Sequence, residues 1–171
     1  MDTISILTPT DFPETLIVER LRAHWEITGN GESSSPYCVQ VPWDTRSTRV
    51  YIYKEAKADI HREGYYSQRF RDQFDSWGDA QIFSVDYSWV LLANKVLMSI
   101  ADDDRMFVDL NLDIVMWGHE LVRKLRSNPS WDWRAEWRRE HPSANADGPR
   151  ALDFPAKGLT GAEKRQARKR G

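Results

Sequence analysis

One segment in the C-terminal third of the chain combines tryptophan with arginine in a way that suits binding. Its candidate partner-binding residues are Trp131, Trp133, Arg134, Trp137 and Arg138. Indole and guanidinium groups are enriched at the anchor points of protein interfaces, and both can stack on single-stranded nucleic acid. The helical period points Trp133 and Trp137 to one side and Trp131 elsewhere, so one side could be exposed. The alternative is that Trp133 and Trp137 complete the core while Trp131 covers a helix junction.

A second pattern is typical of calcium ligands but lacks a decisive residue. Asp109, Asn111, Asp113 and Glu120 match the first, third, fifth and twelfth positions of an EF-hand loop. The sixth position requires glycine for a sharp bend, and here it is Ile114. No helix is expected before the loop either. We therefore predict no metal here: Asp113 should cap a helix while the preceding polar residues face solvent.

The remaining reactive residues lack the neighbours that their chemistry needs. Asp59, His61 and Glu63 alternate and would share one face of a strand as metal ligands, although charged residues ahead of a helix are a simpler interpretation. His119 begins no zinc-protease motif, because the second histidine is replaced by Arg123.

Cys38 is the single cysteine and lies on an expected strand, so we expect a buried, inert thiol. The sequence contains no glycine-rich phosphate loop, nucleophile elbow or cysteine pair, and we expect no cofactor. An enzyme with a dispersed acidic site around Asp59, His61 or Asp109 stays open as an alternative.

The charge is distributed unevenly along the chain. Residues 157–171 contain six basic residues and one acid, and the whole chain has a net charge of -2, so residues 1–156 carry about -7. The acidic body suits a basic protein partner and argues against a broad DNA-binding face. The tail could still contact nucleic acid or an acidic partner through Lys164, Arg165, Arg168, Lys169 and Arg170. Its alternative role is to keep the protein soluble or to pair with the acidic body.

The composition is that of a globular protein. Of 171 residues, 40% are hydrophobic and 29% charged, which excludes a disordered chain, and no run is long and apolar enough to span a membrane. The first residues have neither a basic region nor a long apolar region of the kind found in signal peptides. With no possible internal disulfide, these features favour a cytoplasmic protein.

Several elements are clearly marked by their hydrophobic period and their end signals. We expect helices over residues 13–28, 64–77, 114–126 and 131–140, and strands over 37–41 and 49–54. Asp11 should cap the first helix and Ser130 the last.

Residues 80–111 are ambiguous. One interpretation is a three-stranded meander over 80–85, 89–100 and 106–110, with a bend at Asn94–Lys95. The other is a helix over 89–100 capped by Asp86, which matches the helical period well. We favour the strands, because residues 89–100 are apolar on both faces and Asp102 to Asp104 are typical of a turn.

Together these elements predict an α+β fold: a mainly antiparallel sheet of about five strands with three to four helices packed mostly on one face. Residues 1–142 would form a single domain, and 143–171 a linker and a flexible basic tail. The acidic body, the eight tryptophans and the lack of catalytic motifs favour a non-enzymatic macromolecule-binding protein. It could be an inhibitor or immunity-type protein that neutralises a basic protein partner. The alternatives are a nucleic-acid-associated accessory protein and the dispersed-site enzyme.

Overall fold

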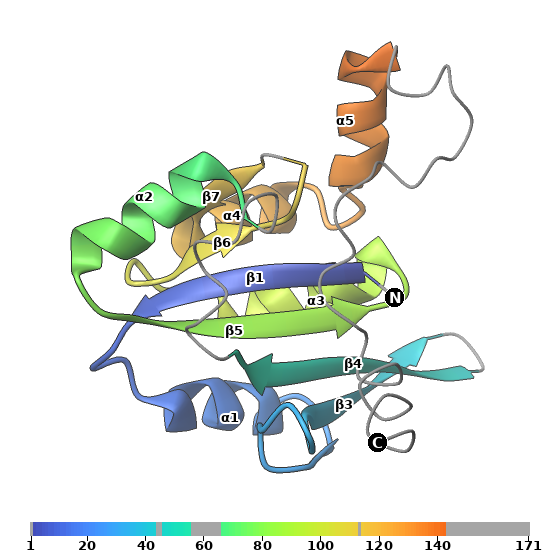
Figure 1. Ribbon diagram of the computed structural model, residues 1–171. Coiled ribbons are helices and arrows are strands. Elements are labelled where there is room, and N and C mark those ends of the chain that lie inside the picture. The colour runs from blue at the N-terminus through green and yellow to red at the C-terminus, as the bar shows by residue number, and fades with distance from the viewer. Residues whose placement is uncertain (1, 44–45, 56–65, 113, 143–171) are drawn as a thin grey trace, which may run out of the picture.

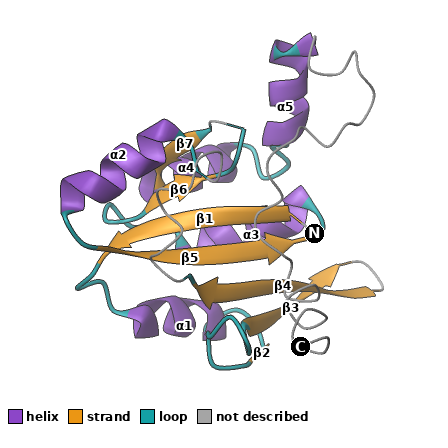
Figure 2. Cartoon of the chain, in the orientation of Figure 1, coloured by secondary structure: helices purple, strands orange, loops and turns teal. Residues whose placement is uncertain are grey.

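A computed structural model of the chain describes residues 2–43, 46–55, 66–112 and 114–142 (Figures 1 and 2). The helices are α1 (Glu14–Arg22), α2 (Gln68–Trp77), α3 (Val90–Ile100), α4 (Gly118–Ser127) and α5 (Trp133–Glu140). The strands are β1 (Asp2–Pro9), β2 (Ile27–Thr28), β3 (Tyr37–Trp43), β4 (Arg46–Lys54), β5 (Ala80–Tyr87), β6 (Phe107–Asp109) and β7 (Val115–Trp117).

All seven strands belong to one antiparallel sheet with the order β2-β3-β4-β5-β1-β6-β7. The predicted α+β class is confirmed, although the sheet has seven strands rather than about five. Strands β1 and β5 lie side by side near its middle and pair from Asp2 opposite Tyr87 to Pro9 opposite Ala80 (Figure 1). The sequence analysis did not identify β1, because this strand has no turn signal before it.

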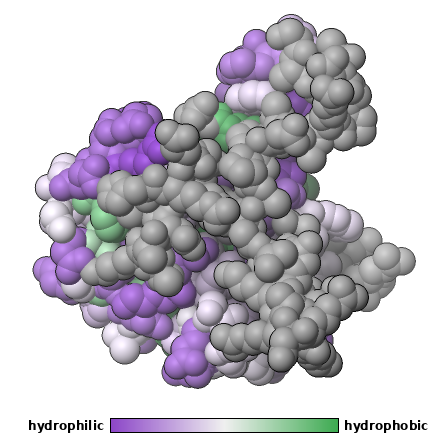
Figure 3. Space-filling view, viewed as in Figure 1, coloured by the Kyte–Doolittle hydropathy of each residue, from purple (hydrophilic) through white to green (hydrophobic). Residues whose placement is uncertain are grey.

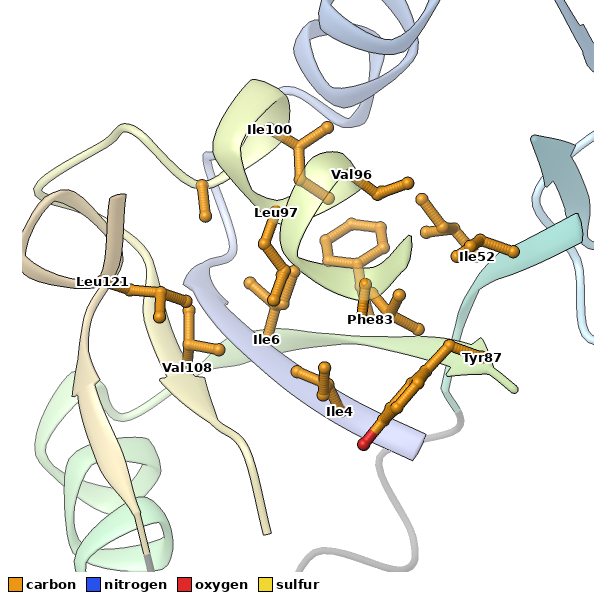
Figure 4. Close-up of a cluster of buried hydrophobic side chains, with 14 of the residues drawn as sticks. Ile4, Ile6, Ile52, Phe83, Tyr87, Val96, Leu97, Ile100, Val108 and Leu121 are labelled. Carbon is orange, nitrogen blue, oxygen red and sulfur yellow. The ribbon is translucent and has the colours of Figure 1, made fainter. Parts of the chain in front are cut away.

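The main hydrophobic core lies on one face of the sheet. Ile4 and Ile6 of β1 and Phe83 of β5 are buried there against Val96 and Leu97 of α3 (Figure 4). Side chains of α1 and α4 belong to the same core. Because burying one large apolar side chain is worth about 1.5–3 kcal/mol, this layer is the main source of stability.

A smaller core lies on the opposite face, under α2. Phe70 packs there with Leu7, Ile82 and Phe107, which lie on β1, β5 and β6. Three helices therefore cover one face, and α2 covers part of the other. None of the helices within the described ranges is long and apolar enough to cross a membrane.

The favoured strand interpretation of residues 89–100 is wrong, and the rival helix is present as α3. The segment is apolar on both sides because the sheet buries one side while α1 and α4 flank the helix. Asn94, expected at a hairpin bend, is a buried helical residue. Its Nδ2 donates to the carbonyl oxygens of Pro129 (3.1 Å) and Trp131 (2.9 Å). Asp86 does not cap α3, which starts after Trp89 without a side-chain cap.

Several helix starts also differ from the predictions. Helix α1 has no side-chain cap, so Asp11 does not cap it, and it ends at Arg22, well before the glycines expected to end it. Helix α4 begins only at Gly118, because the residues before it pair with β6 as strand β7. Asp132 rather than Ser130 caps α5, accepting hydrogen bonds from two backbone N–H groups.

Candidate functional site

The tryptophans expected on a binding surface are mostly in the core. Trp131 is 5% exposed and Trp133 is 0% exposed. Their ring centroids lie 5.7 Å apart, and Trp133 also makes an edge contact with Tyr87 at 6.2 Å. These two indoles therefore fasten the start of α5 to the domain and are buried away from any partner.

Arg134 is also engaged within its own chain. Its guanidinium donates to the Asp2 carboxylate at 2.6 Å and lies 5.4 Å from the centre of the Tyr87 ring. Burial raises the pKa of Tyr87 to about 12, although the nearby positive charge of Arg134 acts in the opposite direction. Arg134 thus joins α5 to the beginning of β1.

The outer half of α5 projects from the sheet and its helices (Figure 1). Trp137 is half-buried and stacks on His141 with 4.5 Å between ring centroids, and Arg138 is exposed. A partner-binding role for these two residues stays a prediction. The basic residues Lys164, Arg165, Arg168, Lys169 and Arg170 lie outside the described residues, as do Asp59, His61 and Glu63.

The acidic pattern at Asp109 forms a tight turn between β6 and β7. Asp109 is 2% exposed, and its carboxylate accepts hydrogen bonds from the backbone N–H of Asn111 (2.8 Å) and of Ser67 (3.3 Å). Asn111 and Leu112 have positive φ values of 66° and 60°. The expectation that Asp109 and Asn111 face solvent is therefore wrong for Asp109, which is buried because it holds this turn and the start of α2 together.

Asp113 lies outside the described residues. The prediction that this position caps α4 is wrong, because the helix starts five residues later, at Gly118. Glu120 instead accepts a hydrogen bond from the backbone N–H of Trp117 at 3.3 Å. Within the described ranges, no three His, Cys, Asp or Glu side chains gather as metal ligands.

A group of polar side chains that the sequence analysis did not predict lies on the sheet face beside α2. They come from alternate positions of three adjacent strands and the residue after β4, and we call them the acidic sheet face. Its members are Thr3, Tyr51, Tyr53, Glu55, Ser84 and Asp86. No described helix lies over β4 or over the Ser84–Asp86 end of β5, since α2 contacts β6 and β1 and packs on Ile82 at the other end of β5.

Short hydrogen bonds orient the two carboxylates of this face. Thr3 Oγ1 donates to Asp86 Oδ1 at 2.6 Å, and Ser84 Oγ donates to Glu55 Oε1 at 2.5 Å. Both acidic side chains are partly exposed, whereas Ser84 is buried. A carboxylate has about four acceptor positions, so it can accept several hydrogen bonds at once.

Tyr53 remains neutral between these acids. Burial, together with the negative charges of Asp86 and Glu55, raises the pKa of the Tyr53 hydroxyl well above its usual value. Tyr53 and Tyr51 are each half-buried. The face therefore combines two fixed negative charges with two aromatic rings, a combination that favours binding of an ammonium or guanidinium group.

Cys38 pairs with Tyr51 across β3 and β4, next to the acidic sheet face. It is half-buried, not fully buried as expected. The signal for the whole face was available as alternation of polar residues in Thr3–Ser5 and Ser84–Asp86. It could be interpreted only once β1 was known to lie beside β5.

Figure 3, which shows the molecule from the side of Figure 1, has mostly hydrophilic residues among the described ones in view, with a small hydrophobic area beside α2. The described surface on this side is therefore largely polar.

Comparisons with protein-family models, with curated proteins and with solved structures found no match to this chain.

Proposed function

We propose that this chain is a non-enzymatic binding protein that neutralises a basic protein partner, as an inhibitor or immunity-type protein does. The acidic sheet face is the proposed binding surface. The observation that carries the proposal is the pair of partly exposed carboxylates, Glu55 and Asp86, each oriented by a hydroxyl donor. These groups are already held in place, so binding a cation costs little further side-chain entropy.

Two further properties support a basic partner. The negative charge of residues 1–156 would attract a basic protein over a distance and speed its association. Tyrosine is enriched at binding hot spots, and Tyr51 and Tyr53 flank the carboxylates. The nucleic-acid and enzyme alternatives remain predictions, and the described residues add no observation in their favour.

The test compares a variant of the acidic sheet face that lacks both negative charges with a control that is changed elsewhere on the surface. Asp86→Asn and Glu55→Gln keep the shape and one acceptor oxygen of each side chain while removing both charges. Glu19→Gln removes one charge from α1, on the opposite side of the sheet, where Glu19 is exposed. Each protein, as the full chain, is used to capture a partner from cells of its source.

We expect the unmodified chain and the control to retain one basic protein in stoichiometric amount. The double variant should bind that protein at least tenfold more weakly, a loss of about 1.4 kcal/mol or more. Raising the salt concentration should slow association of the unmodified chain. Equal affinity of the double variant and the control, or capture of no stoichiometric basic protein, would contradict the proposal.

A further inference from the structure

The acidic sheet face presents two negative charges whose hydrogen-bond donors are uncharged. Glu55 and Asp86 are partly exposed, and their carboxylates accept from the hydroxyl groups of Ser84 and Thr3. Because a hydroxyl group carries no charge, these bonds orient the carboxylates without neutralising them. Since no described helix lies over this part of the sheet, a positively charged segment can approach it from outside.

The same chain contains a segment of the opposite charge. Residues 157–171 carry a net charge of +5, from six basic residues and one acidic residue, whereas residues 1–156 carry about -7. We call residues 164–170 the basic segment, after its members Lys164, Arg165, Arg168, Lys169 and Arg170. Opposite charges attract over about 8 Å at physiological ionic strength, so charge complementarity favours this segment as the occupant of the acidic sheet face.

The helix that precedes the basic segment in the chain is attached close to this face. Arg134 of α5 donates to Asp2 at 2.6 Å, and the next residue of β1, Thr3, belongs to the face (Figure 1). From Arg134 to the end of α5 at Glu140 is about 9 Å. Residues 143–163 then precede Lys164, and a linker of about 20 residues typically spans about 25 Å. The basic segment can therefore reach the face, at an effective concentration on the order of a millimolar.

From this arrangement we infer that the basic segment binds the acidic sheet face of its own chain and shields it while no partner is bound. Its arginine and lysine side chains pair with Glu55 and Asp86 and lie against the rings of Tyr51 and Tyr53. Exposed ion pairs are individually weak, so the contact is reversible and sensitive to salt. The consequence for a partner rests on the proposed function: a basic protein has to displace the segment before it binds.

One exposed cation on the same side of the sheet opposes this contact. Arg49 lies two residues before Tyr51 on β4, so both side chains point to the same side, and Arg49 is exposed. Glu55 lies about 20 Å further along the chain direction. Repulsion from Arg49 should therefore keep the basic segment toward Glu55, and Arg49→Gln should strengthen the contact.

The first test places a nitroxide spin label in the basic segment and measures the relaxation of backbone amides by NMR. Ala167→Cys carries the label in a Cys38→Ser background of the full chain. We expect faster amide relaxation at Tyr53 and Ser84, and no change at Glu19 on the other side of the sheet. About 1 M salt, at which charges are screened beyond about 3 Å, should abolish the effect.

Two variants and a mixed sample identify the occupant. The effect at Tyr53 should disappear when Asp86→Asn and Glu55→Gln are both present, whereas the control Glu19→Gln should retain it. A mixture of spin-labelled chain with isotope-labelled chain that has no spin label reports contacts between copies, and it should show no faster relaxation. Relaxation in the mixture, relaxation that survives loss of both carboxylate charges, or none at Tyr53 and Ser84 would each overturn the inference.

The second test measures the consequence for partner binding. A variant with glutamine at all five basic positions of the basic segment should bind the captured basic protein at least threefold more tightly than the unmodified chain at low salt. Removing positive charge also strengthens attraction at long range, so the same substitutions are repeated without the charges of Glu55 and Asp86, where the gain should be lost. An equal gain in both backgrounds would contradict shielding of the face.

The two proposals fail separately. Faster relaxation at Tyr53 without capture of a basic protein would support binding of the basic segment and contradict the proposed function alone. Capture of a basic protein without faster relaxation at Tyr53 would support the proposed function and overturn this inference.

Discussion

Gly118 shows how a single residue without a side chain is required by packing. Its N–H donates to the carbonyl oxygen of Met106 at 2.7 Å. A Cβ atom at this position would lie 2.1 Å from the carbonyl oxygen of Ala101, a backbone atom that has little freedom to move. The start of α4 can approach the end of α3 only because position 118 is glycine.

We therefore predict that Gly118→Ala lowers the free energy of unfolding by about 1–3 kcal/mol or more, through overpacking. Gly78→Asn is the control, because Gly78 has a φ of 67° that asparagine tolerates, and no atom lies within 4 Å of its added Cβ. Urea unfolding of the variants measures the difference. If Gly118→Ala and the unmodified protein unfold at similar urea concentrations, the start of α4 can move away from the end of α3 without loss of stability, and the prediction is wrong.

At the scale of elements, α3 is positioned by a polar residue in an otherwise apolar helix. Asn94 is fully buried, and its amide holds the loop between α4 and α5 against α3. The same loop carries Trp131 into the core, so α5 is placed by this contact and by the pair between Arg134 and Asp2. One buried amide thus links three helices.

Asn94→Ala should remove both hydrogen bonds and leave two carbonyl groups without this donor, at a cost of about 1–3 kcal/mol. We expect faster hydrogen exchange at the Trp131 N–H, which donates to the Asn128 carbonyl oxygen at 3.0 Å. Arg123→Ala, at an exposed position of α4, should change neither quantity. If exchange at Trp131 is unaffected in Asn94→Ala, the loop is held mainly by its indole.

At the scale of the whole molecule, two parts of the sheet with no further strand beside them have few free backbone groups: β7, and the end of β3 that extends past the two-residue strand β2. On β7, the outward carbonyl oxygen of Val115 accepts from Arg69 at 3.2 Å, and the Trp117 N–H donates to Glu120. On β3, the outward N–H of Gln40 bonds to the Glu26 carbonyl oxygen. The next outward position, two residues on, is Pro42, which has no N–H to donate.

Pro42→Val restores a donor on an exposed part of β3 and should increase self-association. Gln40→Val is the control, since it adds a similar side chain on the same strand at a position whose N–H is already bonded. Static light scattering at rising concentration should detect larger species for the first variant. Equal scattering by both variants would mean that another feature protects this edge.

The local period of the chain was sufficient to predict the α+β class, the strands β3 and β4, and most of α2, α4 and α5. These elements could be predicted because hydrophobic spacing and end signals act over neighbouring residues. Residues 90–100 fitted both the strand pattern and the helix pattern. An element that is covered on several sides is apolar whichever of the two structures it adopts.

Which tryptophans are buried and which polar side chains meet depended instead on residues that are distant in the sequence. Trp131 and Trp133 are hidden because α3 and Tyr87 lie beside them, and nothing in their spacing specifies those neighbours. Likewise Asp86 and Thr3 are far apart in the chain and meet only because β1 inserts between β5 and β6. Hydrophobic spacing identifies which residues share a side of an element, but the packing of elements decides which sides meet and which face water.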